Sequence, residues 1–162
     1  MILKGKKSKK VRLLSSKGII NAVCISKEKG VVKRNVGEAK LIKNYGIEGD
    51  AHASSKWHRQ VSLLSTESMN KMKKQLPDKN ITYGSFGENL NVEGIILHTL
   101  PVGTLLKAGE TLLEVSQIGK ECHSPCEIGR TTGYCVMPEE GIFVRVLKGG
   151  KVKVGASVII IH

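Results

Sequence analysis

The order of apolar and polar residues along the chain predicts a protein made mostly of short β-strands. Runs rich in Val, Ile and Leu, separated by glycine-containing or charged turns, occur at residues 18–26, 31–32, 38–42, 60–64, 88–92, 104–107, 111–118 and 157–161. Runs of this length between turn-forming residues are typical of strands. Because closure leaves no exposed strand edge, we expect a mainly β fold that closes as a barrel, with a few short helices.

Glycines refine this prediction at two places. Gly149 and Gly150 separate the apolar runs 142–147 and 151–154. Two glycines between such runs favour a tight hairpin, because the primed turns need positive φ, so we expect these two strands to pair. Residues 45–52 contain too many turn-forming residues to make a regular element, and we expect a loop there.

One helix is predicted, over residues 65–76. Ser65 can cap its start, Met69 and Met72 fall on one face, and Pro77 would end it. The adjacent Glu139 and Glu140 lie instead in a segment that we expect to be extended. Their side chains would then point apart, and we assign them no acid–base role.

The net charge of +12 is unevenly distributed. Residues 1–16 contain six of the 26 Lys and Arg residues and no acid, which leaves 20 basic against 14 acidic residues, or +6, for residues 17–162. We expect a basic disordered arm over 1–16 and one domain over 17–162. The mildly basic domain suits a phosphorylated small ligand, and its few aromatic residues do not favour a specific nucleic-acid site.

Other classes of protein are disfavoured by the same sequence. No apolar run approaches the roughly 18 residues of a membrane span, and no apolar segment follows the basic arm as in a secretion signal. Four cysteines are too few for a dense disulfide framework, so we expect reduced thiols in a cytoplasmic protein. The hydrolase motifs Gly-x-Ser-x-Gly and His-Glu-x-x-His are absent from the sequence.

Residues 119–126 (Gly-Lys-Glu-Cys-His-Ser-Pro-Cys) carry the strongest chemical signal. A cysteine reacts as the thiolate, which neighbouring cations stabilise, and Lys120 and His123 lie beside Cys122. Cys122, His123 and Cys126 are therefore candidate catalytic residues. Two alternatives stay open: inert thiols in a turn, or a zinc site that uses these residues with Cys135. Cys24, inside an apolar run, is expected to be a core residue.

A second group of residues could bind an anion. His52, His58 and Arg59 surround the glycine-rich segment that contains Asp50, and they could orient a substrate; the alternative is an ordinary polar surface loop. The segment 84–87 (Gly-Ser-Phe-Gly) could bring backbone N–H groups to a phosphate, although it lacks both the Rossmann fingerprint and the P-loop.

Taken together, these segments resemble the MOSC family, the domain found at the C-terminus of molybdenum-cofactor sulfurases and as stand-alone bacterial proteins. The matching stretches follow the family's order: residues 46–52, 58–64, 84–90, 100–103, 113–117 leading to Cys122, and 136–138 through 141–146. The sequence departs from the family pattern at Ala53, where glycine is commoner, and at Ala156, where aspartate is frequent.

The resemblance implies a barrel like the one inserted in pyruvate kinase. It implies molybdopterin-cofactor binding, sulfurtransferase-type delivery of sulfur to a metal–sulfur centre, or both. Cys122 would carry the persulfide or ligate molybdenum, with Cys126 as the alternative. The implied cofactor-binding residues are His52, His58, Arg59, Gly84, Gly87, Asn89 and Lys120.

The same resemblance leaves other functions open. The chain could be a molybdenum-dependent oxidoreductase subunit with cysteine-ligated metal, or a non-catalytic molybdopterin-binding module. A cysteine desulfurase and a molybdoenzyme are the implied partners. Pyridoxal phosphate is not expected, because it belongs to a separate desulfurase domain of the full-length sulfurases.

Overall fold

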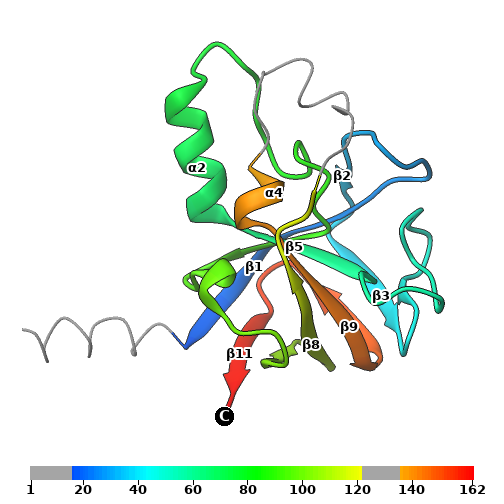
Figure 1. The fold of residues 1–162 in the computed structure, drawn as a ribbon. Coiled ribbons are helices and arrows are strands. Elements are labelled where there is room, and N and C mark those ends of the chain that lie inside the picture. The colour runs from blue at the N-terminus through cyan, green and yellow to red at the C-terminus, as the bar shows by residue number, and fades with distance from the viewer. Residues whose placement is uncertain (1–15, 122–135) are drawn as a thin grey trace, which may run out of the picture.

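Seven strands close into the barrel that the sequence predicts (Figure 1). The computed structural model describes residues 16–121 and 136–162. Around the barrel the strands follow the order β1 (Lys17–Ile25), β6 (Leu90–Glu93), β5 (Val61–Ser65), β9 (Ile142–Lys148), β8 (Thr111–Ile118), β7 (Leu105–Ala108) and β11 (Ser157–Ile161). The predicted ends of these strands lie within two residues of the observed ones.

Pairing between the first and last strands closes the barrel. β1 and β11 are antiparallel, with Lys17 opposite Ile159 and Ile19 opposite Ser157. Neighbouring strands in the ring are antiparallel except β5 and β6, which are parallel. Val, Ile and Leu side chains such as Ile20, Leu63 and Leu113 form one fully buried core cluster. The scarcity of aromatic residues is therefore matched by a core of branched aliphatic side chains.

The predicted helix is confirmed as α2 (Thr66–Gln75). The Ser65 side chain caps its first turn by accepting a hydrogen bond from the Ser68 backbone N–H at 3.3 Å. Met69 and Met72 are buried in a second apolar cluster together with Met137. The helix ends at Gln75, and its C-cap Leu76 stands immediately before the proline that was expected to stop it.

Residues 137–140 are not extended as predicted, but form the short helix α4 (Met137–Glu140). Pro138 lies at the start of the helix, where a missing N–H is tolerated. The Glu140 carboxylate accepts a hydrogen bond from Ser68 Oγ at 2.6 Å and pairs with Lys71. Glu140 therefore joins α4 to α2. A single 3₁₀ turn, η1 (Leu97–Thr99), was also not predicted.

The predicted hairpin at Gly149 and Gly150 is wrong. β10 (Gly150–Lys153) pairs with β3 (Glu38–Ile42), and β3 in turn pairs with the two-residue β4 (Gly46–Ile47), which lies within the predicted loop. A side chain at Gly149 would place its Cβ 2.6 Å from the Leu41 carbonyl oxygen. The glycines therefore allow a close approach to β3, and the chain passes from the barrel into a separate three-stranded sheet.

Residues 31–32 also do not form the predicted strand. The strand beside them is β2 (Arg34–Asn35), which pairs with the end of β1. Val32 is half exposed, so two adjacent β-branched residues did not indicate a buried run here.

Helices α2 and α4 and strand β2 lie toward one end of the barrel, and the C-terminus lies at the other (Figure 1). Within the described residues, no helix is long and apolar enough to cross a membrane.

Candidate functional site

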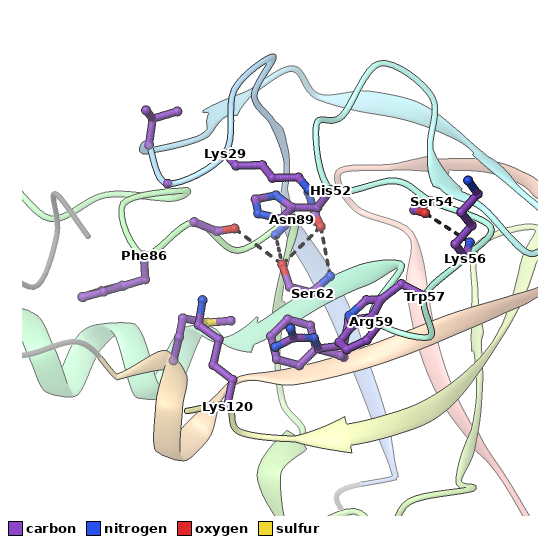
Figure 2. A pocket seen from close by; sticks show the side chains of 15 residues that line it. Lys29, His52, Ser54, Lys56, Trp57, Arg59, Ser62, Phe86, Asn89 and Lys120 are labelled. Atoms are coloured by element: carbon purple, nitrogen blue, oxygen red, sulfur yellow. Dashed lines mark hydrogen bonds between the residues drawn. The ribbon is translucent and has the colours of Figure 1, made fainter. Parts of the chain in front are cut away.

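A pocket of about 560 Å³ lies between the loops that follow β1 and β4, the segment that precedes β6 and the helix α4 (Figure 2). Its size falls within the roughly 300–1,000 Å³ that is common for small-molecule sites. Its walls combine polar and apolar residues: Lys29, Gly30, Val31, His52, Ser54, Lys56, Trp57, Arg59, Ser62, Phe86, Gly87, Asn89, Lys120, Met137 and Phe143.

Positive charge dominates this pocket. Lys29, Lys56, Arg59 and Lys120 line it, and among the described lining residues there is no Asp or Glu. Like charges gathered without a counterion raise the local potential and attract anions. The pocket is therefore suited to a ligand that carries phosphate or another anionic group.

The Arg59 side chain is positioned by aromatic rings. Its Cζ lies 4.7 Å from the ring centroid of Trp57 and 5.3 Å from that of Phe143. Trp57 also stacks on His58, with centroids 5.0 Å apart and an interplanar angle of 24°. Cation–π contacts of this kind hold a guanidinium by its face and leave its N–H edge for a ligand.

A buried carboxylate shapes the turn over residues 84–87. Glu88 accepts hydrogen bonds from the backbone N–H of Gly84 at 3.0 Å and of Phe86 at 3.2 Å. Complete burial raises the pKa of Glu88, and these bonds act against the rise. Gly84 has φ +86°, and a Cβ there would lie 2.1 Å from the Lys33 carbonyl oxygen. Gly84 thus packs against the backbone at Lys33. Gly87 lines the pocket.

Asn89 lines the pocket but is held by the protein. Its Oδ1 accepts hydrogen bonds from the Ser62 backbone N–H at 2.9 Å and from Ser62 Oγ at 3.1 Å (Figure 2). Its Nδ2 donates to the Cys24 carbonyl at 2.9 Å. Asn89 therefore joins β5 to β1 across the pocket floor.

The sequence-predicted anion-binding residues separate into two groups. His52, Arg59, Gly87, Asn89 and Lys120 line the pocket, whereas His58 and Gly84 do not. The His58 ring packs on Trp57, and its carbonyl accepts a hydrogen bond from Ser116 Oγ at 2.8 Å. His58 therefore supports the wall that carries Trp57 and Arg59.

Lys120 lines the pocket and stands close in the sequence to the segment that contains Cys122. It follows the end of β8, and it lines both this pocket and an adjoining hollow with Gly119 and Pro138. Cys122 is two residues further along the chain. The predicted residues Cys122, His123 and Cys126, and the zinc alternative that adds Cys135, lie outside the described residues.

The core assignment of Cys24 is confirmed. Its side chain is fully buried in β1. Burial, with the Glu88 carboxylate adding to the effect, raises the pKa of the Cys24 thiol to about 12. The thiol is therefore protonated and shielded at neutral pH, and it does not act as a nucleophile.

Comparison with known proteins assigns the family. The profile of the MOSC domain matches residues 48–159, which is more than half of the chain. The chain belongs to the MOSC domain family. A MOSC-related sequence is Protein YiiM of Escherichia coli (strain K12), which is 27% identical over 112 residues, or 65% of this chain. The match spans only 50% of YiiM.

Solved structures share the MOSC barrel. The YUAD protein of Bacillus subtilis superimposes with a TM-score of 0.73, covering 89% of this chain and 95% of YUAD at 18% identity. YiiM of Escherichia coli gives 0.66, with 90% and 70% covered at 20% identity. YiiM of Geobacillus stearothermophilus gives 0.69, with 90% and 75% covered at 20% identity. These structures confirm the fold.

Sequence reasoning missed part of the MOSC pocket. No sequence motif marked Lys29 or Lys56, and Phe143 lies within the predicted strand 142–147. Trp57 offered a signal, because the only Trp of the chain stands two residues before Arg59. Met137 and Phe86 come from elements whose approach to the pocket depends on the tertiary fold.

Proposed function

We propose that this MOSC domain binds molybdopterin, or a similar phosphorylated ligand, in the cationic pocket. We further propose that it acts in the cytoplasm and carries sulfur on Cys122 for delivery to a metal–sulfur centre. The observation that carries the proposal is the meeting of Lys29, Lys56, Arg59 and Lys120 around one pocket, without a carboxylate among its described lining residues.

The residues of the pocket fit a phosphorylated pterin. Arg59 would bind the phosphate with two N–H donors, and Lys120 would add a mobile point charge. Phe86 and Met137 offer apolar surface for a ring system. When bound, the cofactor would supply a molybdenum centre that takes part in sulfur or electron transfer. The described residues contain no cluster of three or more His, Cys, Asp or Glu side chains able to hold a metal. In the alternative function as an oxidoreductase subunit, Cys122 would be the molybdenum ligand.

Transfer of sulfur from a donor persulfide to Cys122 exchanges one S–S bond for another, so it needs no oxidant or reductant. The Cys122 thiolate would attack the outer sulfur of a persulfide on a cysteine desulfurase, forming a new S–S bond. The donor's S–S bond would break, and its cysteine would leave as thiolate. Lys120, two residues away in the sequence, would favour the Cys122 thiolate over the thiol. Delivery would need a thiol as the two-electron reductant: its thiolate would attack the inner (Cys122) sulfur and form a disulfide with Cys122. The persulfide S–S bond would break, and the outer sulfur would leave as sulfide for the metal–sulfur centre of a molybdoenzyme partner.

Purification from cells that make the cofactor tests this function. The measurements are released pterin by fluorescence, molybdenum by mass spectrometry, and cyanide-labile sulfur. We expect the wild type to retain pterin and labile sulfur, and Cys122→Ser to keep the pterin but lose the sulfur. Cys24→Ala is the matched control and should retain both. Cys126→Ser distinguishes the alternative thiol.

Other outcomes would replace the proposal. Stoichiometric molybdenum that depends on Cys122, without labile sulfur, would identify an oxidoreductase subunit that receives electrons from a partner. Bound pterin without sulfur or molybdenum would identify a cofactor-binding module. Tight zinc that is lost on substitution of Cys122 or Cys126 would identify a structural metal site. A protein that retains no pterin, molybdenum or labile sulfur would refute the proposed function.

A further inference from the structure

A buried lysine stands directly behind the imidazole of His52. The Lys33 ammonium is almost fully buried and lies 2.7 Å from Asp50 Oδ1, 3.1 Å from Ser26 Oγ and 3.1 Å from His52 Nδ1. An ammonium group has three N–H bonds and no acceptor. These three neighbours therefore use its full donor capacity.

This contact fixes the tautomer of His52. Because the Lys33 ammonium can only donate, Nδ1 of His52 must accept, and its lone pair cannot carry a proton at the same time. The proton of the neutral ring then lies on Nε2. The usual histidine metal ligand has the opposite arrangement, in which a carboxylate or carbonyl accepts the second N–H and leaves the other nitrogen for the metal.

The His52 backbone is fixed by the same cluster. Asp50 Oδ2 accepts a hydrogen bond from the His52 backbone N–H at 3.1 Å, and Asp50 Oδ1 accepts one from the Ser26 backbone N–H at 3.1 Å. The Asp50 side chain is completely buried, whereas the His52 side chain is 44% exposed and lines the pocket (Figure 2). The cluster thus connects a buried ion pair to one side chain at the ligand site.

We propose that Lys33 and Asp50 hold His52 as a neutral Nε2–H donor for an acceptor oxygen or nitrogen of the pocket's ligand. His52 is then a specificity-determining residue, and it serves neither as a metal ligand nor as a base through Nε2. The donor role rests on the proposed ligand-binding function, whereas the tautomer follows from the ligand-free protein.

The charges around the ring agree with this assignment. Burial is the largest of the effects that together lower the pKa of His52 to about 4; Lys33, Lys120 and Lys29 act in the same direction as burial, and Asp50 opposes them. Asp50 is already paired with Lys33, so its effect on the ring is offset. His52 therefore adds a hydrogen bond to the cationic pocket without adding a charge. A ligand that presents an N–H or O–H at this point would leave the Nε2–H group without a partner.

Nitrogen NMR of the full chain in the absence of ligand tests the tautomer. We expect the His52 spectrum at pH 7 to show a protonated Nε2 and an unprotonated Nδ1, with the exposed His162 as the comparison signal. Removing Lys33 alone would leave the Asp50 carboxylate buried without its cation, so the paired variant Lys33→Met/Asp50→Asn is used. In this variant we expect both tautomers, and a His52 pKa closer to the ordinary 6.5. A protonated Nδ1 in the wild type, or a ring charged at pH 7, would overturn the inference.

Ligand titrations test the donor role with two probes, inorganic phosphate and a pterin monophosphate. His52→Gln keeps an N–H at a similar reach, and His52→Leu removes it. We expect Leu to weaken binding about 3- to 10-fold and Gln to restore most of the affinity, as for one neutral hydrogen bond. Weakening of both probes would assign the acceptor to the phosphate, and weakening of the pterin probe alone would assign it to the pterin ring.

Two results separate the inference from the proposed function. Unchanged affinity of His52→Leu for both probes would overturn the donor role while the pocket still binds. A wild type that binds neither probe would refute the proposed function and the donor role with it. The tautomer would then still be decided by the NMR measurement in the ligand-free protein.

Discussion

Arg59 lies over the ring of Trp57, with its Cζ 4.7 Å from the ring centroid. This relationship gives an exposed tryptophan a role, since Trp57 is half exposed and yet fixes a charged side chain at the edge of the pocket. A guanidinium held by its face loses less freedom when a ligand binds to its edge. The side chain is therefore preorganised for an anion.

Replacing Arg59 should weaken ligand binding. We expect Arg59→Ala to reduce the affinity for a pterin monophosphate by about 1.5–3 kcal/mol, because charged hydrogen bonds are lost. Calorimetric titration measures the change. Arg145→Ala is the control, because Arg145 pairs with Glu114 on β8, 3.7 Å away, and does not line the pocket. Unchanged affinity of Arg59→Ala at low salt would place the ligand elsewhere.

The cysteines should differ strongly in reactivity. At neutral pH we expect an alkylating reagent to modify Cys122 first and Cys24 only after unfolding, because burial raises the Cys24 pKa to about 12. Peptide mapping by mass spectrometry identifies the modified residues. Equal rates at Cys122 and Cys24 in the folded protein would contradict a reactive site at Cys122.

The buried ion pair between Lys33 and Asp50 should matter greatly for stability. We expect Asp50→Asn to lower the free energy of unfolding by about 3–5 kcal/mol, because it leaves the buried Lys33 charge without its counterion. Glu38→Gln is the matched control: Glu38 pairs with Lys151 at the surface, and we expect a change of at most about 1 kcal/mol. Urea denaturation measures both. Similar losses for the two variants would show that burial of the pair is not decisive.

The low pKa of His52 predicts a pH dependence of stability. The unfolded chain binds this proton near pH 6.5 and the folded protein only near pH 4, so protons favour unfolding between these values. The stabilisation of the folded protein by neutral His52 is complete above pH 6.5, and it is lost as the pH falls from 6.5 toward 4. Relative to His52→Gln, the wild type should therefore lose free energy of unfolding across this window. A constant difference between the two proteins from pH 7 to 4 would argue against the lowered pKa.

Removal of the basic arm should leave the domain folded. Residues 1–14 lack the apolar periodicity needed to offset roughly 1–2 kcal/mol of ordering entropy per residue. The truncation leaves Ser16, whose carbonyl accepts a hydrogen bond from the Ile160 backbone N–H at 3.0 Å. We expect a melting temperature close to that of the full chain. A drop of many degrees would show that the arm contributes to the barrel.

Local sequence signals were enough for most elements. The Ser65 cap and the proline after Leu76 predicted the helix, and the apolar runs predicted the barrel strands. Both kinds of signal depend only on residues that are close together in the sequence. The pairing of β10 could not be found in this way. The glycines at 149–150 allow a hairpin equally well, and only the nearness of Leu41 determines that β10 joins β3.

The candidate site was predictable where a polar residue stands in or beside a glycine-containing segment. Arg59 and His52 were found because they flank the glycine-rich segment, and both line the pocket. The role of Lys33 was not predictable, because a lysine in a turn is usually exposed. Its burial follows from acceptors at Ser26, Asp50 and His52 that come together only in the folded chain.

The pairing of β1 with β11 also sets an order on protein synthesis. β1 is synthesised first among the barrel strands and β11 last. Residues 17–19 therefore cannot pair with residues 157–159 until the end of synthesis. Until the ribosome has released β11, the growing chain has an open sheet with a free edge, a form that associates with other chains. A pause or early stop in translation just before β11 would therefore produce an aggregation-prone fragment that contains every described residue lining the pocket.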